Sequence, residues 1–297
     1  MRRRARTRSR STAARSIPVA RGFARGLQPV RDTVLVEVYL HELGYLPIVD
    51  GRLDTATIDA IKRFQRDQDL VVDGIAGEKT WTKLFASCPD LTAAIAAKWL
   101  SRADLETTAA TLQLPVPTVR AVYKVESGGS GFWGLQPRIL FEGHVFWRRL
   151  KARGKDPAAL QAGFEDVLYP QWDRSKYIGG PAEYGRLQRA QQIDSAAALE
   201  SASWGLFQIM GYHAESLGYG DVDRFVAAMN EREGAQLDAF GRFVSRTRFG
   251  GRTLLLWLQA RNWAKFAHGY NGSGFRANRY DVKLRLAYEA ALADEAR

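Results

Sequence analysis

Residues 123–132 read Tyr-Lys-Val-Glu-Ser-Gly-Gly-Ser-Gly-Phe and place one glutamate, Glu126, directly before a run of glycines. Val119, Val122 and Glu126 follow a helical spacing, so the carboxylate points to the same side as the apolar residues. The glycines end this helix. A carboxyl group in such a place loses part of its hydration, which raises its pKa and keeps it protonated near neutral pH. The stretch therefore predicts either a general acid or a surface glutamate followed by a glycine cap.

The composition predicts a globular protein of one large or two modest domains. The chain has 297 residues, of which 46% are hydrophobic and 11% aromatic, enough for a packed core. Cys88 is the single cysteine, which rules out an intrachain disulfide. The four histidines show no paired ligand spacing, so we expect no metal site and no cofactor. No segment approaches the roughly 18 apolar residues that a transmembrane helix needs.

The basic charge of the chain is concentrated in its first residues. The formal net charge is +11, and residues 1–31 hold ten arginines and no acid, which leaves +1 for the other 266 residues. Arg-, Ser- and Ala-rich sequence without apolar periodicity predicts a disordered tail. Such a tail attracts polyanions, among them the anionic outer-membrane surface of Gram-negative bacteria, or is an extension without function. We expect no nucleic-acid binding, because the folded part is nearly neutral.

Residues 32–87 have the turn signals of a small helical unit. Two Asp-Gly turns, Asp50-Gly51 and Asp73-Gly74, bracket a helix that carries Phe64-Gln65. This order resembles the three-helix peptidoglycan-binding module of bacterial and phage cell-wall lysins. It departs from that module at Leu53-Asp54, where an aromatic residue and a glycine are usual. The resemblance implies a wall-binding surface, which we expect to include Tyr45, Arg52 and Trp81.

The remainder of the chain is interpreted as a linker and one larger domain. Residues 88–100 contain a Cys-Pro-Asp break and a connecting helix. Residues 101–297 show no second composition shift of domain size, and we expect one helical domain with a short β or loop insertion around residues 132–140. The fold class is therefore mainly α, with a small three-helix module and an α-rich second domain.

Several later stretches carry polar groups within apolar sequence. Glu142 and His144 lie in Ile-Leu-Phe-Glu-Gly-His-Val-Phe-Trp, where they either satisfy each other or face a ligand. Asp173 follows an aromatic cluster and suits a helix cap. Amides and aromatic rings beside glycines suit a sugar, because ring faces stack on aromatics and hydroxyls pair with amides. The residues of this kind are Trp204, Gln208, Tyr270 and Asn271.

In chain order, Glu126-Ser-Gly-Gly, Ser203-Trp-Gly-Leu-Phe-Gln-Ile-Met-Gly211 and Tyr270-Asn-Gly272 resemble motifs of the lysozyme-like superfamily. The fuller match resembles the N-acetylmuramidase domain of phage endolysins that attack Gram-negative hosts. It also includes Glu142, His144, Trp172-Asp173, Glu183-Tyr184 and Asn278-Arg-Tyr-Asp281. One departure is Gly143, where a basic residue is expected.

The resemblance implies hydrolysis of the β-1,4 bond between N-acetylmuramic acid and N-acetylglucosamine, with Glu126 as general acid. Glycosidases usually employ a second carboxylate, for which Glu200 is our first candidate and Glu142 and Asp173 are the others. The expected substrate-binding residues are Trp204, Gln208, Tyr270, Asn271, Glu142 and His144. Two alternatives stay open: a lytic transglycosylase, which uses one glutamate, and a non-catalytic wall-binding protein.

The expected partner is peptidoglycan, and we expect a monomer. No apolar run of the kind found in signal peptides follows the first arginines. The resemblance therefore implies a protein that stays in the host cytoplasm until a membrane pore releases it to the cell wall.

Overall fold

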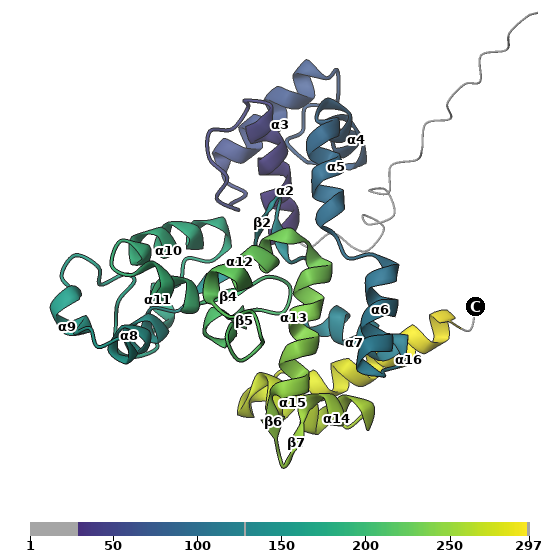
Figure 1. The fold of residues 1–297 in the computed structure, drawn as a ribbon. Helices are drawn as coiled ribbons and strands as arrows, with labels where there is room; N and C mark the ends of the chain where they lie inside the picture. Colours follow the sequence, from purple (N-terminus) through teal and green to yellow (C-terminus); the bar gives the residue numbers. More distant parts are fainter. Residues whose placement is uncertain (1–28, 128, 296–297) are drawn as a thin grey trace, which may run out of the picture.

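The computed structural model describes residues 29–127 and 129–295. The predicted tail, residues 1–31, lies outside this description except for its last three residues, which begin the helix α2 (Pro29–Glu42). The described chain is mainly helical with a few short strands, which confirms the predicted fold class. Figure 1 shows α2 to α5 as a separate group above the larger domain.

The small module is built from α2, α3 (Thr55–Asp67), α4 (Glu78–Ser87) and α5 (Pro89–Lys98). Its core gathers apolar side chains from all four helices: Val36, Tyr39, Leu40, Ala60, Ile61, Phe64, Trp81, Leu84, Cys88 and Ile95. The segment 88–100, which the sequence suggested as a linker, thus supplies part of this core. The reason is that Cys88 and Ile95 are buried, and the Tyr39 hydroxyl lies 2.9 Å from Thr92 Oγ1.

The two Asp-Gly turns of the module are held in the same way. The buried Glu37 carboxylate accepts hydrogen bonds from the Asp50 and Gly51 amides, at 3.1 and 2.7 Å. Gln65 Oε1 accepts from the amides of the second turn, with the Gly74 nitrogen at 2.9 Å. Both turn glycines have positive φ, near +77°, which favours glycine. The two Asp-Gly dipeptides of the sequence therefore form turns of the same geometry.

The larger domain begins with α6 and α7 and ends with α16, which packs along α7. Its helices are α6 (Arg102–Leu112), α7 (Val116–Glu126), α8 (Gly143–Ala152), α9 (Pro157–Leu160), α10 (Glu183–Gln191), α11 (Ser195–Glu200), α12 (Val222–Glu231), α13 (Glu233–Arg246), α14 (Leu254–Gln259), α15 (Trp263–Asn271) and α16 (Tyr280–Glu295). Four 3-10 turns join them: η1 (Arg174–Lys176), η2 (Gly180–Ala182), η3 (Gly211–His213) and η4 (Ser273–Phe275).

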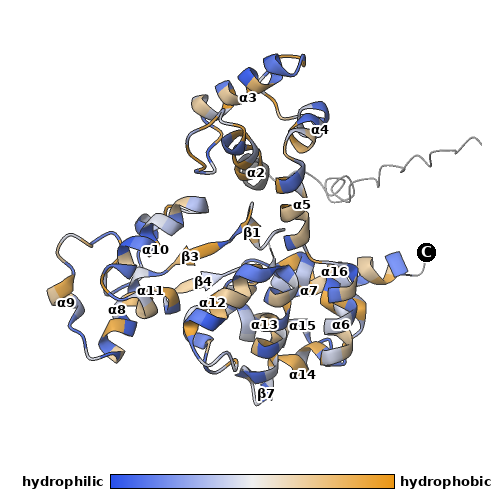
Figure 2. Cartoon of the chain, turned by 45° about the horizontal axis from the view of Figure 1, so that its top comes forward, coloured by the Kyte–Doolittle hydropathy of each residue, from blue (hydrophilic) through white to orange (hydrophobic). Residues whose placement is uncertain are grey.

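The strands are short and lie in three antiparallel groups. Their bounds are β1 (Phe132–Trp133), β2 (Gln136–Pro137), β3 (Ile139–Phe141), β4 (Ala202–Trp204), β5 (Ile209–Met210), β6 (Arg248–Phe249) and β7 (Arg252–Thr253). The expected insertion around residues 132–140 corresponds to β1, β2 and the start of β3. The sequence did not indicate that β3 pairs with β4, with Ile139 opposite Trp204 and Phe141 opposite Ala202. Figure 2 shows β3 and β4 side by side, between α10 and α12.

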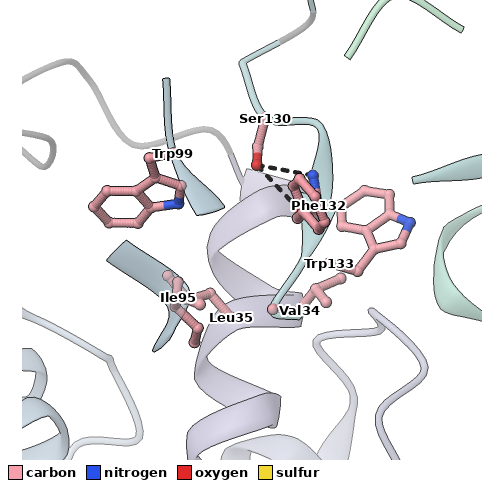
Figure 3. Close-up of a pocket in the computed structure, with 8 residues that line it drawn as sticks. Val34, Leu35, Ile95, Trp99, Ser130, Phe132 and Trp133 are labelled. Carbon is pink, nitrogen blue, oxygen red and sulfur yellow. Dashed lines mark hydrogen bonds between the residues drawn. The ribbon is translucent and has the colours of Figure 1, made fainter. Parts of the chain in front are cut away.

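The module docks on the larger domain through α2, α5 and the β1–β2 hairpin. A Cβ at Gly134 in the hairpin would approach the Val38 side chain of α2 to 3.0 Å. A small cavity lies between the two parts, lined by Val34, Leu35, Ile95, Trp99, Ser130, Phe132, Trp133 and Gly134 (Figure 3). Within the described ranges, no helix combines the length and apolar character needed to cross a membrane.

Candidate active site

The helix α7 presents Glu126 at its last position. Its buried face carries Val119, Ala121 and Val122, which pack in the domain core and against α16. The amide of Ser127, the residue after the helix, still donates to the Tyr123 carbonyl at 3.1 Å. The apolar stripe predicted from the spacing is therefore the face through which α7 packs on the rest of the domain. Glu126 lies at the C-terminal end of that face.

The Glu126 carboxyl group is half-buried and has an uncharged hydrogen-bond partner. Asn271 Nδ2, at the end of α15, donates to Glu126 Oε1 at 3.1 Å. Burial raises the pKa of Glu126 to about 7, while the bond from Asn271 and the charge of Lys283 act in the lowering direction. A carboxyl group with this pKa is largely protonated in mildly acidic solution and can donate a proton.

Two tyrosines complete the surroundings of the carboxyl group. The pKa of Tyr270 is raised well above its usual value by burial and by the Glu126 charge, and the pKa of Tyr280 is raised by the same two causes. The Tyr270 hydroxyl donates to the Phe207 carbonyl at 3.0 Å. This bond ties α15 to the turn that follows β4, so the two sides of the site are fixed to each other.

The turn after β4, which the Tyr270 bond ties to α15, carries Gln208. Gln208 is exposed and has a left-handed backbone, with φ of 49°. Its side chain does not swing freely, because Gln208 Oε1 accepts from Ser203 Oγ at 2.9 Å and Nε2 donates to the Gly205 carbonyl at 2.8 Å. An ordered, exposed amide of this kind can bind a sugar hydroxyl or acetamido group.

Gln236 of α13 locks this turn to the loop that follows Glu126. Its Oε1 accepts from the Leu206 amide at 2.7 Å, and its Nε2 donates to the Met229 carbonyl at 2.8 Å. A Cβ at either Gly131 or Gly205 would overlap the Gln236 amide. Only glycine fits at both places, so a single buried glutamine sets the separation of the two loops.

The described residues contain no group of three or more His, Cys, Asp or Glu side chains that could hold a metal ion. Glu126 offers a carboxyl group for acid–base chemistry, and Asn271 offers an amide for polar contacts.

Two known families match parts of this chain. The N-acetylmuramidase family matches residues 115–292, more than half of the chain. The chain belongs to the N-acetylmuramidase family. A putative peptidoglycan binding domain matches residues 31–84. The crystal structure of the Burkholderia AP3 phage endolysin is similar, with 41% identity, a TM-score of 0.63, and coverage of 88% of this chain and 96% of that one. Among curated proteins, none matches.

The chain is thus a modular peptidoglycan hydrolase, with a muramidase domain preceded by a peptidoglycan-binding module. The structure brings together Glu126 and Asn271, from two separate sequence motifs, through the bond between their side chains. Tyr270 lies there as well, but its hydroxyl is bound to the Phe207 carbonyl.

Glu200 of the muramidase domain has a different environment from the one expected. Arg149 Nε donates to its Oε2 at 2.6 Å, and Arg153 donates to both of its oxygens, at 2.6 and 3.0 Å. Burial acts to raise the pKa of Glu200, but the bonds from Arg153 and Arg149 outweigh it and hold the pKa below its usual value. Glu200 is thus in an ion pair with two guanidinium groups, an environment that does not favour its predicted role as the second catalytic carboxylate.

Trp204 is also corrected, because it is 2% exposed and belongs to the core of the muramidase domain. Its Nε1 donates to the Leu199 carbonyl at 3.1 Å. A tryptophan beside a glycine in the sequence can either stack on a sugar or pack in the core, because both kinds of tryptophan occur next to turns. The sequence pattern therefore could not distinguish the two roles.

The other two candidate carboxylates have partners of their own. Glu142 accepts from the Tyr177 hydroxyl, and burial raises the pKa of Glu142. His144 Nδ1 lies 3.3 Å from Glu142 Oε2 without a hydrogen bond, and burial lowers the pKa of His144. Asp173 caps η1 by accepting from the Ser175 amide, as its position suggested.

Gly143 departs from the family pattern for a steric reason. A Cβ there would overlap the ring of Tyr169 and the carbonyl oxygen of Val167. The close approach of these two residues to the start of α8 therefore requires glycine in this chain.

In the wall-binding module, Trp81 is 5% exposed and stacks on Phe85 at 5.5 Å between ring centroids. It is a core residue, which corrects its expected place on a binding surface. Tyr45 is half-buried and donates to Asp67 Oδ2 at 2.7 Å, while Arg52 is exposed beside the first Asp-Gly turn. These two stay predictions as wall-binding residues.

Sequence patterns did not indicate two buried polar residues that support the site, Glu233 and Gln236. Both lie on the first turn of α13, where Glu at a helix start is an ordinary favourable charge. Their spacing of three residues on an otherwise apolar helix face was the one signal that could have identified them.

Proposed function

We propose that this muramidase acts as an endolysin that cleaves the β-1,4 bond between N-acetylmuramic acid and N-acetylglucosamine, with Glu126 as the general acid. The observation that carries the proposal is the half-buried Glu126 carboxyl group, whose pKa is about 7 and which accepts a hydrogen bond from the neutral amide of Asn271. A protonated carboxyl at neutral pH is what protonation of a leaving oxygen requires.

The reaction begins when Glu126 transfers its proton to the bridging oxygen, which is O4 of N-acetylglucosamine. The bond from C1 of N-acetylmuramic acid to that oxygen breaks as positive charge develops at C1. A water molecule then forms the new bond to C1 and gives a proton to the Glu126 carboxylate. The acid is restored, and the products are one new reducing end and one new O4 hydroxyl.

We infer that Glu126 serves without Glu200 or Asp173. The first is bound by Arg149 and Arg153, and the second caps η1. The exposed amide of Gln208 and the amide of Asn271 are proposed to hold the sugar on either side of the carboxyl group. Glu142 and His144, which follow β3, are proposed to contact a more distant part of the substrate.

A lytic transglycosylase, which needs one carboxyl group, is the second candidate, and a specific observation favours it: Glu200 is bound by two arginines and Asp173 caps η1. In that reaction the 6-hydroxyl of the same muramic acid replaces water as nucleophile, and its proton returns to Glu126. The two reactions give different products. Mass spectrometry of a digest of purified peptidoglycan should show reducing ends, and anhydromuramic ends in their place would overturn the hydrolase proposal.

We also propose a route to the wall. The protein stays in the host cytoplasm as a monomer until a membrane pore admits it to the periplasm, and residues 1–31 engage the anionic outer surface of the cell. Deletion of residues 1–28, which leaves α2 complete, should preserve activity on purified peptidoglycan and reduce activity on intact cells. Equal loss on both substrates, or no loss on cells, would contradict a surface role for the tail.

A further inference from the structure

The segment that joins the wall-binding module to the muramidase domain is anchored at the corner between α12 and α13. Lys98, the last residue of α5, donates through Nζ to the carbonyls of Asn230 and Glu231, at 2.6 and 3.0 Å. Arg232 Nη2 donates to Asp104 Oδ2 of α6 at 2.5 Å. Figure 1 shows α5 leading into α6 beside this corner. The junction is therefore a bonded contact and not a loose tether.

Glu233, the next residue at this corner, connects the junction to the loop after Glu126. It is 2% exposed. Its Oε2 accepts from the Leu100 amide at 2.8 Å, on the junction side. Its Oε1 accepts from the Gly131 amide at 2.8 Å and from Ser130 Oγ at 3.3 Å, on the loop side. A buried carboxylate needs all such donors, so both sides are held in one geometry.

The loop has little freedom to move away from Glu233. Gly131 is packed against the Gln236 amide, one turn further along α13, where no Cβ would fit. Ser130 also accepts from the Phe132 amide, and its side chain lines the cavity between the module and the muramidase domain (Figure 3). Ser130 and its neighbours thus contact the docked module and also belong to the loop that follows Glu126.

We propose that Glu233 is a positioning residue for the muramidase reaction, through which the docked wall-binding module sets the position of the loop that follows Glu126. The proposal rests on the proposed role of Glu126 as the acid. If Glu233 no longer holds Gly131 and Ser130, the loop loosens and water reaches the carboxyl group. The groups that face Glu126 from the neighbouring helices, Asn271, Tyr270, Tyr280 and Lys283, stay where they are.

The readout is the alkaline limb of the pH profile on soluble peptidoglycan fragments, where the acid loses its proton. If part of a variant preparation is misfolded, the rate falls by the same factor at every pH, and the pH at which the alkaline limb begins does not change. Better hydration of Glu126 moves the limb to lower pH instead. Glu233→Gln should move it down by roughly 0.5–1 pH unit and lower kcat by about tenfold, because the amide group opposes one of the N–H donors.

Glu231→Gln is the matched control. It removes the same charge from an exposed side chain two residues before Glu233, and the variant should keep the alkaline limb of the wild type. Lys98→Met tests the module side of the contact without touching the loop, and it decides the question if Glu233→Gln does not fold. We expect a smaller shift in the same direction.

A wild-type limb in either folded variant would overturn the proposed coupling. The assignment of the acid is judged separately by Glu126→Gln. If Glu126→Gln is inactive while the limbs of the other two variants are unchanged, the acid assignment stands and the positioning role of Glu233 does not.

Discussion

Glu126 and Glu200 are each the last residue of a helix in the muramidase domain, yet the structure gives them opposite properties. Glu126 ends α7 and accepts from the neutral Asn271 amide, and burial raises its pKa to about 7. Glu200 ends α11 and is bound by Arg149 and Arg153, which hold its pKa below the usual value. A helix C-terminus disfavours negative charge in both cases. The partners therefore decide which glutamate keeps a proton.

This difference assigns different tasks to the two residues. A carboxyl group that is protonated near neutral pH can donate its proton in catalysis. A carboxylate with two guanidinium partners joins α11 to α8 and contributes to stability, but it has no proton to donate. Four substitutions and conditions test the contrast, from the largest expected effect to the smallest.

Glu126→Gln should lower the rate of peptidoglycan cleavage by about 10³-fold or more, because the amide cannot donate the proton. Release of soluble fragments from purified peptidoglycan measures this rate. Glu200→Gln is the paired variant and should keep its activity within about threefold at a temperature where it is folded. Equal loss in both variants would remove the functional distinction between them.

Glu200→Gln should lower the free energy of unfolding by about 1–3 kcal/mol at pH 7, because it leaves two arginines without their carboxylate. The Glu200 pKa is lowered in the folded state, so its stabilisation is complete above the unfolded pKa and is lost as pH falls through the folded pKa. Urea unfolding of variant and wild type should therefore converge in acid. Glu106→Gln, in the exposed Arg102–Glu106 pair, should show no measurable change.

The pH dependence of activity should follow the proton on Glu126. Its pKa is raised to about 7, so the acid is competent below that pH, and the rate should fall about tenfold for each pH unit above it. Soluble fragments separate this effect from wall binding. For stability the sign is the same: the folded state holds this proton more tightly than the unfolded state, so the contribution is present at low pH and is lost as pH rises through about 7.

Asn271→Leu should move the alkaline limb to higher pH by roughly 0.5–1 unit, because the donor that favours the charged carboxylate is gone while the volume is kept. Asn278→Ala, which removes an exposed amide in the same region, is its control. A downward movement of the limb in Asn271→Leu would mean that the Asn271 amide mainly excludes water from Glu126, and not that it stabilises the charged carboxylate.

Local patterns predicted a good part of this molecule. The helical spacing of Val119, Val122 and Glu126 and the glycines that follow identified α7 and its carboxyl group. Two Asp-Gly turns identified the wall-binding module. Long-range placement was not predictable in the same way: Trp204 and Trp81 are core residues, because burial of an aromatic ring depends on what packs over it. Glu233 and Gln236 were missed, because their partners are about 100 and 30 residues distant in sequence.

The sequence alone determined the family, the order of the two parts and the presence of a glutamate at the end of an apolar helix face, because spacing and turn chemistry are local. Only the tertiary structure decided which glutamate keeps its proton. A pKa depends on the groups that surround a carboxyl group in space, and Asn271 reaches Glu126 across 145 residues of chain while two arginines from α8 and its end reach Glu200.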